Sequence, residues 1–124
     1  MPRLCRAVMA VAIVAVIAPA SSCAVAADAA RGRELYDARC SGCHSIDADR
    51  IGPRHRGVVG RKAGGIGGFE YSPALHDSTI VWTPVTLDRW LTDPEKLIPG
   101  QRMNISVAEA ADRADLIAFL ATTR

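Results

Sequence analysis

The stretch Cys40-Ser41-Gly42-Cys43-His44 decides how the rest of this chain is interpreted. Residues three apart lie on one side of a helical turn, so both thiols can meet one planar group from the same side. This C-x-x-C-H spacing is the pattern through which haem is attached covalently to proteins. On this interpretation, Cys40 and Cys43 form thioethers with the two vinyl groups of a haem c, and His44 binds its iron.

The N-terminal residues predict a signal peptide over residues 1–26. Two arginines precede an apolar run from residue 7 to residue 18, which is too short to span a bilayer, and Ala24-Val25-Ala26 forms a cleavage site of small residues. Two of the 15 basic residues leave with this segment and all 13 acidic residues stay, so residues 27–124 carry 13 charges of each sign. This balance and this length exclude a polybasic nucleic-acid binder, a multidomain enzyme and a transmembrane protein.

Export predicts a periplasmic location for the domain formed by residues 27–124. Cys5 and Cys23 leave with the signal peptide, so Cys40 and Cys43 are the two cysteines of the exported domain. A lipid anchor on Cys23 is a minor alternative, because Ala20 is a poor substitute for the leucine that lipoprotein processing prefers.

The C-x-x-C-H motif has three other interpretations. A thioredoxin-like redox pair requires a βαβ context, which the flanking sequence does not predict. A zinc site requires two further ligands, and only His55 and His76 remain in the exported domain. The third is coincidence. A structural disulfide does not explain the two cysteines either, because a bridge between Cys40 and Cys43 would close a very small loop and constrain the unfolded chain little. Covalent haem is the favoured interpretation.

The hydrophobic periodicity predicts an all-α domain with three main helices. Asp28 is placed to cap a helix that ends at Arg39. Thr83-Pro84 opens a second helix that Asp93-Pro94 ends, and the stretch Ser106–Glu109 predicts a capping box at the start of a third. Asp112 and Asp115 on this last helix are expected to be ordinary surface charges.

The remaining segments are long loops around a small core. Residues 51–72 contain Pro53 and seven glycines, which is typical of irregular structure. Three short helices with two tryptophans, two tyrosines and two phenylalanines have too few large side chains to enclose a core. A bulky apolar group is expected to complete it.

Met103 is the favoured candidate for the second axial position of an iron bound by His44. It is the only methionine of the exported domain and follows the Pro99-Gly100 turn, from which its thioether can reach the opposite face of the ring. Core filling is the alternative role of Met103.

The two remaining histidines compete with Met103 for that position. His76 lies in a polar stretch and is expected in a solvated loop. His55 is flanked by Arg54 and Arg56, which favours a surface position over ligation.

These motifs together resemble a class I cytochrome c, the group that includes mitochondrial cytochrome c and related bacterial cytochromes. The resemblance covers essentially all of residues 27–124. The matching segments occur in order, and they are CSGCH at 40–44, Gly-Pro at 52–53, GVVGRKAG at 57–64, TLDRWLTDPEKLIPGQRM at 86–103 and ADLIAFL at 114–120.

The resemblance implies the cytochrome c fold, with helices and loops wrapped around one covalently bound haem and with His44 and Met103 as axial ligands. It implies that the Pro53 carbonyl accepts a hydrogen bond from His44 and fixes the imidazole. His55 stands where the family commonly has an apolar residue near the haem. The positions that in the family hold the haem propionates are occupied here by Arg61, Tyr71 and Trp82.

The predicted function is that of an exported, periplasmic one-electron carrier with one haem c per chain, and not of an enzyme. Its expected partners are a redox-protein donor and a redox-protein acceptor, with no nucleic acid and no membrane span, and the protein is a monomer or a subunit of a redox complex. One alternative is a cytochrome subunit bound tightly to an exported oxidoreductase. Another is a five-coordinate haem sensor or gas binder.

Overall fold

The computed structural model describes residues 25–124 of the chain. The signal peptide predicted over residues 1–26 lies outside the described residues, except for Val25 and Ala26, and so does Cys23. Among the helices of residues 25–124, none is both long enough and apolar enough to cross a membrane.

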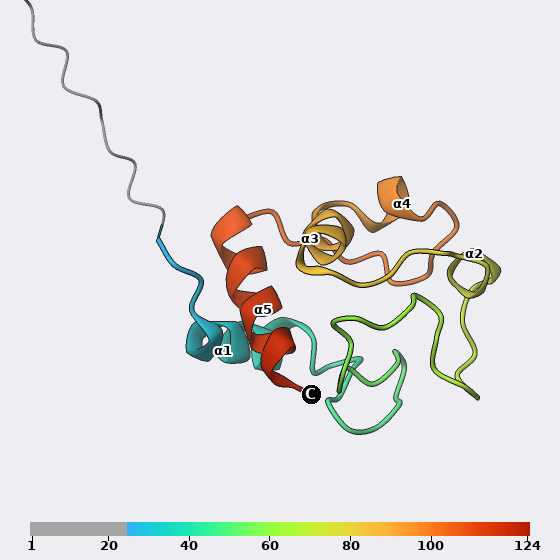
Figure 1. Cartoon of the computed structure of the whole chain (residues 1–124), viewed down its shortest axis with the longest axis horizontal. Coiled ribbons are helices and arrows are strands. Elements are labelled where there is room, and N and C mark those ends of the chain that lie inside the picture. The colour runs from blue at the N-terminus through green and yellow to red at the C-terminus, as the bar shows by residue number, and fades with distance from the viewer. Residues whose placement is uncertain (1–24) are drawn as a thin grey trace, which may run out of the picture.

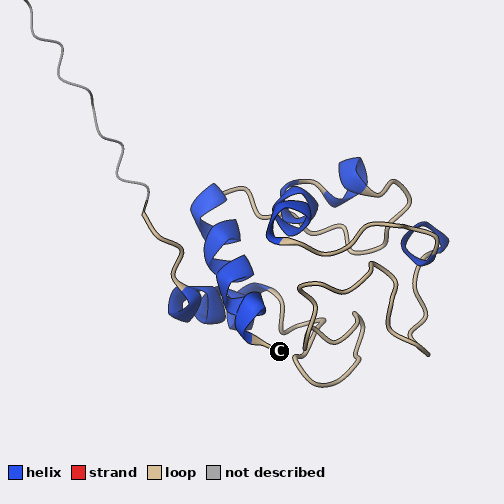
Figure 2. Cartoon of the chain, in the orientation of Figure 1, coloured by secondary structure: helices blue, strands red, loops and turns tan. Residues whose placement is uncertain are grey.

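Helices and loops make up the described part of the chain, which confirms the all-α prediction (Figures 1 and 2). The long helices α1, α3 and α5 are the three that the sequence predicts, whereas the single-turn helices α2 and α4 are additional. Within residues 25–124, the β interactions amount to one isolated bridge between Lys62 and Val81. The helices in chain order are α1 (Ala29–Arg39), α2 (Pro73–His76), α3 (Pro84–Thr92), α4 (Pro94–Leu97) and α5 (Ala110–Thr122).

Polar caps set the starts of most of these helices. The Asp28 side chain accepts hydrogen bonds from the first turn of α1, as predicted. Thr83 and Thr86 form a capping box at the start of α3. Both single-turn helices begin with the same combination of a capping side chain and a first-turn proline, Ser72-Pro73 for α2 and Asp93-Pro94 for α4. The cap-and-proline signature that predicts α3 at Thr83-Pro84 therefore also begins α2 and α4.

The predicted capping box of the last helix is wrong. The N-cap of α5 is Glu109, which makes no side-chain cap hydrogen bond, and the helix begins only at Ala110. Tertiary contacts hold the preceding residues extended instead, because the Val107 N–H donates to the Leu91 carbonyl of α3 at 2.7 Å. The Arg113 guanidinium also donates to the carbonyls of Val107 and Ala108, at 2.9 and 2.7 Å.

Helices α1 and α5 cross on one side of the molecule, and the loop of residues 41–72 occupies the other side (Figure 1). Gly32 lies at the crossing, where a Cβ atom would be only 1.9 Å from the Asp115 carbonyl oxygen. Tyr36 packs on Phe119 one turn later, with ring centroids 5.3 Å apart. The absence of a side chain at Gly32 therefore allows the two backbones to approach closely.

Asp112 and Asp115 are buried at this crossing, so their assignment as surface charges is wrong. Their residues are 6% and 7% exposed. Arg31 of α1 bridges them with two N–O distances of 2.6 Å, and Asp115 also accepts a hydrogen bond from the Asp28 backbone at 2.7 Å. Arg39 adds a second contact to Asp112 at 3.2 Å. The two carboxylates thus join α5 to both ends of α1.

Candidate functional site

The C-x-x-C-H motif forms a turn directly after α1. The Cys43 and His44 N–H groups both donate to the Cys40 carbonyl, at 3.1 and 2.9 Å. Both thiols are free, with Cys40 half-buried against the core and Cys43 exposed. Burial raises the pKa of Cys40 to about 11. A thioredoxin-like site lowers its thiol pKa, so the redox-pair interpretation does not fit this environment.

His44 is held by the segment that follows the motif. Its Nδ1 lies 2.7 Å from the Pro53 carbonyl oxygen, as expected, so Nδ1 carries the proton and Nε2 keeps its lone pair. Gly52 lies against the imidazole, where a Cβ atom would be 2.2 Å from Cε1. Burial lowers the pKa of His44 despite the hydrogen bond to Pro53. A neutral, oriented imidazole of this kind is suited to bind a metal.

His55 packs directly against His44, so its predicted surface position is wrong. The two rings are stacked, with centroids 4.1 Å apart and planes inclined by 22°. Its Nδ1 lies 3.1 Å from the Tyr36 hydroxyl oxygen. Burial, with smaller contributions from His44 and Arg61, lowers the pKa of His55 to about 3.

The flanking arginines predict a surface position, but their side chains pair in an outer loop while the ring of His55 turns inward. Arg54 pairs with Asp49 at 2.9 Å, and Arg56 pairs with Asp47 in the same outer loop. His55 between them points to the interior. The Arg54-His55-Arg56 stretch by itself carries no signal of this burial.

The stack also excludes His55 as the ligand opposite His44. Two axial imidazoles point a nitrogen at one metal from opposite sides, each at about 2 Å, and their ring centroids then lie much farther apart than the 4.1 Å observed here. His76 is not placed to be this ligand either, because its exposed side chain pairs with Asp77 at 2.8 Å. This agrees with its predicted position in a solvated loop.

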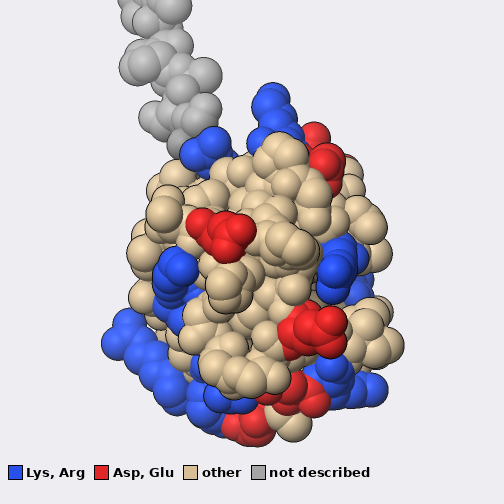
Figure 3. Space-filling view, turned by 90° about the vertical axis from the view of Figure 1, so that its right-hand side faces the viewer, with Lys and Arg blue, Asp and Glu red and all other residues tan. Residues whose placement is uncertain are grey.

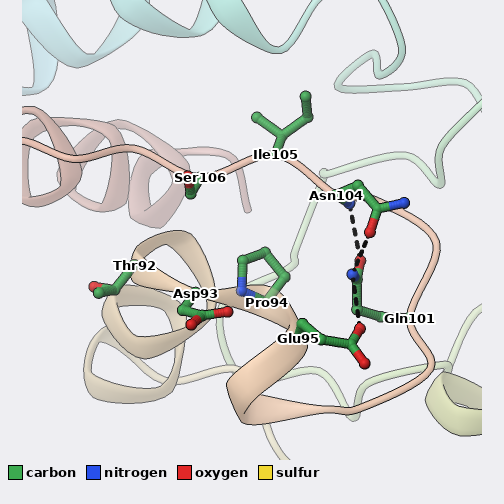
Figure 4. A pocket seen from close by; sticks show the side chains of 8 residues that line it. All are labelled: Thr92, Asp93, Pro94, Glu95, Gln101, Asn104, Ile105 and Ser106. Atoms are coloured by element: carbon green, nitrogen blue, oxygen red, sulfur yellow. Dashed lines mark hydrogen bonds between the residues drawn. The ribbon is translucent and has the colours of Figure 1, made fainter.

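Met103 lies in the loop between α4 and α5 and is half-buried. Its side chain and that of Cys40 pack against the same buried core cluster. Gln101 fixes the loop, because its Oε1 accepts hydrogen bonds from the backbones of Met103 and Asn104 at 2.6 and 2.9 Å. Its Nε2 in turn donates to Asn104 and Glu95 (Figure 4). The residues around Gln101 do not predict this function from the sequence alone.

A hollow of about 330 Å³ lies on the α4 side of this loop. Gln101 and Asn104 of the Met103 loop border it, but none of the motif residues and none of the candidate propionate ligands lines it. Figure 4 shows the side chains that line it, which are Thr92, Asp93, Pro94, Glu95, Gln101, Asn104, Ile105 and Ser106.

The three predicted propionate ligands come from two segments that pair in the structure. The backbone N–H of Trp82 donates to the backbone carbonyl of Arg61 at 2.9 Å, and the Trp82 side chain is buried against Trp90. Burial lowers the pKa of Arg61 and raises that of Tyr71, and the positive charge of Arg61 partly opposes the rise at Tyr71. The Arg61 guanidinium donates to the carbonyls of Arg54 and Arg56, at 2.8 and 2.9 Å.

The donor set fits haem c. Two free thiols stand at the attachment spacing beside a neutral imidazole that has one nitrogen fixed and the other available. A partly buried thioether is present on a separate loop.

Comparisons with known proteins identify the family of this chain. The family described as cytochrome c matches residues 29–124. A cytochrome c 2.1 of Caenorhabditis elegans is 42% identical over 98 residues, which are 77% of this chain and 88% of that protein. The cytochrome c-type cyt cy of Rhodobacter capsulatus is 40% identical over 100 residues, which are 79% of this chain but 50% of that relative. The solved structure of cytochrome cH from Methylobacterium extorquens has a TM-score of 0.73 and 39% identity, with 77% of this chain and 98% of that chain covered.

The chain therefore belongs to the cytochrome c family. Its cofactor is a covalently attached haem c, and it is an electron-transfer protein rather than an enzyme. The predicted fold class and cofactor are confirmed.

Proposed function

We propose that this cytochrome is an exported one-electron carrier between two redox proteins, with thioethers at Cys40 and Cys43 and with His44 and Met103 as axial ligands. The observation that carries the assignment is the hydrogen bond of His44 Nδ1 to the Pro53 carbonyl, at 2.7 Å, beside two free thiols. It leaves Nε2 as the one nitrogen available to iron.

Haem bound at this site supplies a reversible one-electron couple. The chain orients the ligands around it. The Pro53 carbonyl holds the imidazole of His44, and Gln101 holds the backbone of the Met103 loop. A thioether favours ferrous over ferric iron, so Met103 raises the reduction potential compared with a harder ligand. With both His44 and Met103 bound, the iron would have no open position, which would favour electron transfer over ligand binding.

We assign the propionate contacts to Arg61, Tyr71 and Trp82. A guanidinium has five N–H donors, and two of the Arg61 nitrogens donate to backbone carbonyls, so donors remain for a carboxylate. The partial burial of Arg61 and Tyr71 strengthens any charge-assisted hydrogen bond they make. These contacts would partly offset the negative charge of the propionates.

Partner docking is expected to depend on short-range contacts. Figure 3 shows a face that is mostly uncharged, with separate acidic side chains near its centre and basic side chains mainly toward its margin. The charges of residues 27–124 balance. Long-range steering scales with opposed net charges and is screened within about 10 Å at 0.1 M salt, so encounter with either partner should depend only weakly on ionic strength.

One preparation of the protein tests the attachment, the ligands and the export. Mass spectrometry under denaturing conditions should show one haem bound to a chain that begins at Ala27, and reduced protein should not bind carbon monoxide. Haem that extracts into acidified organic solvent would refute the thioethers. Carbon monoxide binding to the wild type would favour the sensor alternative, and a chain that keeps residues 1–26 would refute the cleavage.

A further inference from the structure

We propose that His55, held by Tyr36, is a positioning residue that sets the orientation of the His44 imidazole plane about its bond to iron. This inference rests on the proposed ligation by His44. It concerns a residue pair that neither the ligand set nor the propionate contacts include.

The existing hydrogen bond leaves one motion of the ring unrestrained. An iron bound at Nε2 would lie roughly opposite the Pro53 carbonyl at Nδ1, so a rotation of the ring about the line through these two nitrogens would change neither contact strongly. Besides the bond from the ring to Cβ, groups packed against the faces of the ring resist this rotation, and Gly52 is one of them. His55 is another, because its ring covers the His44 ring at 4.1 Å and is inclined by only 22°.

His55 is itself held firmly at both its backbone and its ring. Its backbone N–H donates to the Ser45 carbonyl at 3.0 Å, and its backbone carbonyl accepts a hydrogen bond from the Val58 N–H at 2.9 Å. The Nδ1 of His55 and the hydroxyl oxygen of Tyr36 are hydrogen-bonded at 3.1 Å. A leucine in this place could fill the space, but it would lack the directional bond that fixes the ring plane.

Tyr36 provides a rigid anchor because it belongs to the helix crossing. The residue is 3% exposed, and its ring lies 5.3 Å from Phe119 of α5 and 5.6 Å from His55. The restraint thus runs from the α1–α5 crossing through the Tyr36 hydroxyl and the His55 ring to His44. Groups that orient a metal ligand also tune the electronic state of the metal.

The test is the set of paramagnetically shifted haem methyl resonances in the proton NMR spectrum of the ferric holoprotein, because their order and spread report the orientation of the axial imidazole. Tyr36→Phe removes only the hydroxyl, and His55→Leu removes both the stack and the hydrogen bond. We expect both variants to change the methyl pattern. The double variant should show the pattern of His55→Leu alone, since the hydroxyl acts through His55. The matched control is His76→Leu at an exposed histidine, which should keep the wild-type pattern.

A wild-type pattern in both Tyr36→Phe and His55→Leu overturns the inference, and so does a Tyr36→Phe change that persists undiminished in the His55→Leu background. If His55→Leu does not accumulate as holoprotein, Tyr36→Phe decides alone. The wild-type spectrum separates the two levels of the argument. A low-spin, histidine-ligated wild type with unaltered variants overturns only the positioning function, whereas a wild type without His44 ligation overturns the proposed function as well.

Discussion

Replacement of Gly32 by alanine should destabilise the protein although alanine is the better helix former. Gly32 lies within α1, where alanine is favoured over glycine by about 1 kcal/mol in intrinsic propensity. At the crossing, however, the new Cβ atom would stand 1.9 Å from the Asp115 carbonyl oxygen and 2.5 Å from its carbonyl carbon. The two effects have opposite signs, so the sign of the measured change decides which one wins.

The obstacle to the new methyl group is backbone, so it cannot move away as a flexible side chain would. Real Cβ atoms essentially never come within 3.0 Å of such an atom, so α1 and α5 must separate by about 1 Å. A gap of 0.5–1 Å forfeits about a quarter to a half of each dispersion contact. Overpacking costs about 1–3 kcal/mol, and a backbone clash belongs at the upper end. After the propensity gain, we expect a net loss of about 2 kcal/mol.

Guanidinium unfolding of the oxidised holoprotein, followed by far-ultraviolet circular dichroism, measures this loss. A change of about 2 kcal/mol should lower the midpoint by roughly 0.5 M at the denaturant dependence of a domain this size. Gly67→Ala is the matched control, because a Cβ atom there meets nothing within 4 Å, and its stability should equal or slightly exceed that of the wild type. A Gly32→Ala variant as stable as the wild type would refute the close crossing of α1 and α5.

Three further predictions concern the site and its support. Met103→Ala should lower the reduction potential and let the reduced protein bind carbon monoxide. Each shift of about 59 mV in the potential is a tenfold change in the equilibrium constant of the one-electron couple. An unchanged optical spectrum and potential would show that Met103 is not a ligand. Cys43→Ala should leave at most one thioether, so mass spectrometry should find less covalent haem than in a Ser41→Ala control, and equal attachment would contradict the assignment. Hydrogen bonds from Asp28 and Arg31 hold the pKa of Asp115 below its usual value, so its contribution to stability is present above about pH 4 and is lost as the pH falls through the lowered pKa. The stability difference between wild type and Asp115→Asn should therefore be large at pH 7 and shrink on acidification, whereas a difference independent of pH would mean that the Asp115 charge is not involved.

Local patterns in the sequence determined the cofactor and most of the helices, because the interactions behind them are local. The spacing of CSGCH expresses the geometry of a single turn, and it was enough to predict covalent haem. The caps at Asp28 and Thr83 bond to backbone N–H groups two to three residues away, so their function follows from the residue type. The predicted hydrogen bond from His44 to Pro53 spans nine residues and depended on the family resemblance instead.

The tertiary structure decided where charged and polar side chains lie, because that depends on residues distant in the sequence. Asp115 is a surface charge on an isolated helix, and only the crossing with α1 brings Arg31 to it from 84 residues away. The predicted capping box at Glu109 does not form, because Val107 bonds to Leu91 of α3. The arginines beside His55 predict a surface position, yet the loop after the C-x-x-C-H motif stacks the His55 ring on His44. In each of these cases a tertiary contact outweighs the preference of the local sequence.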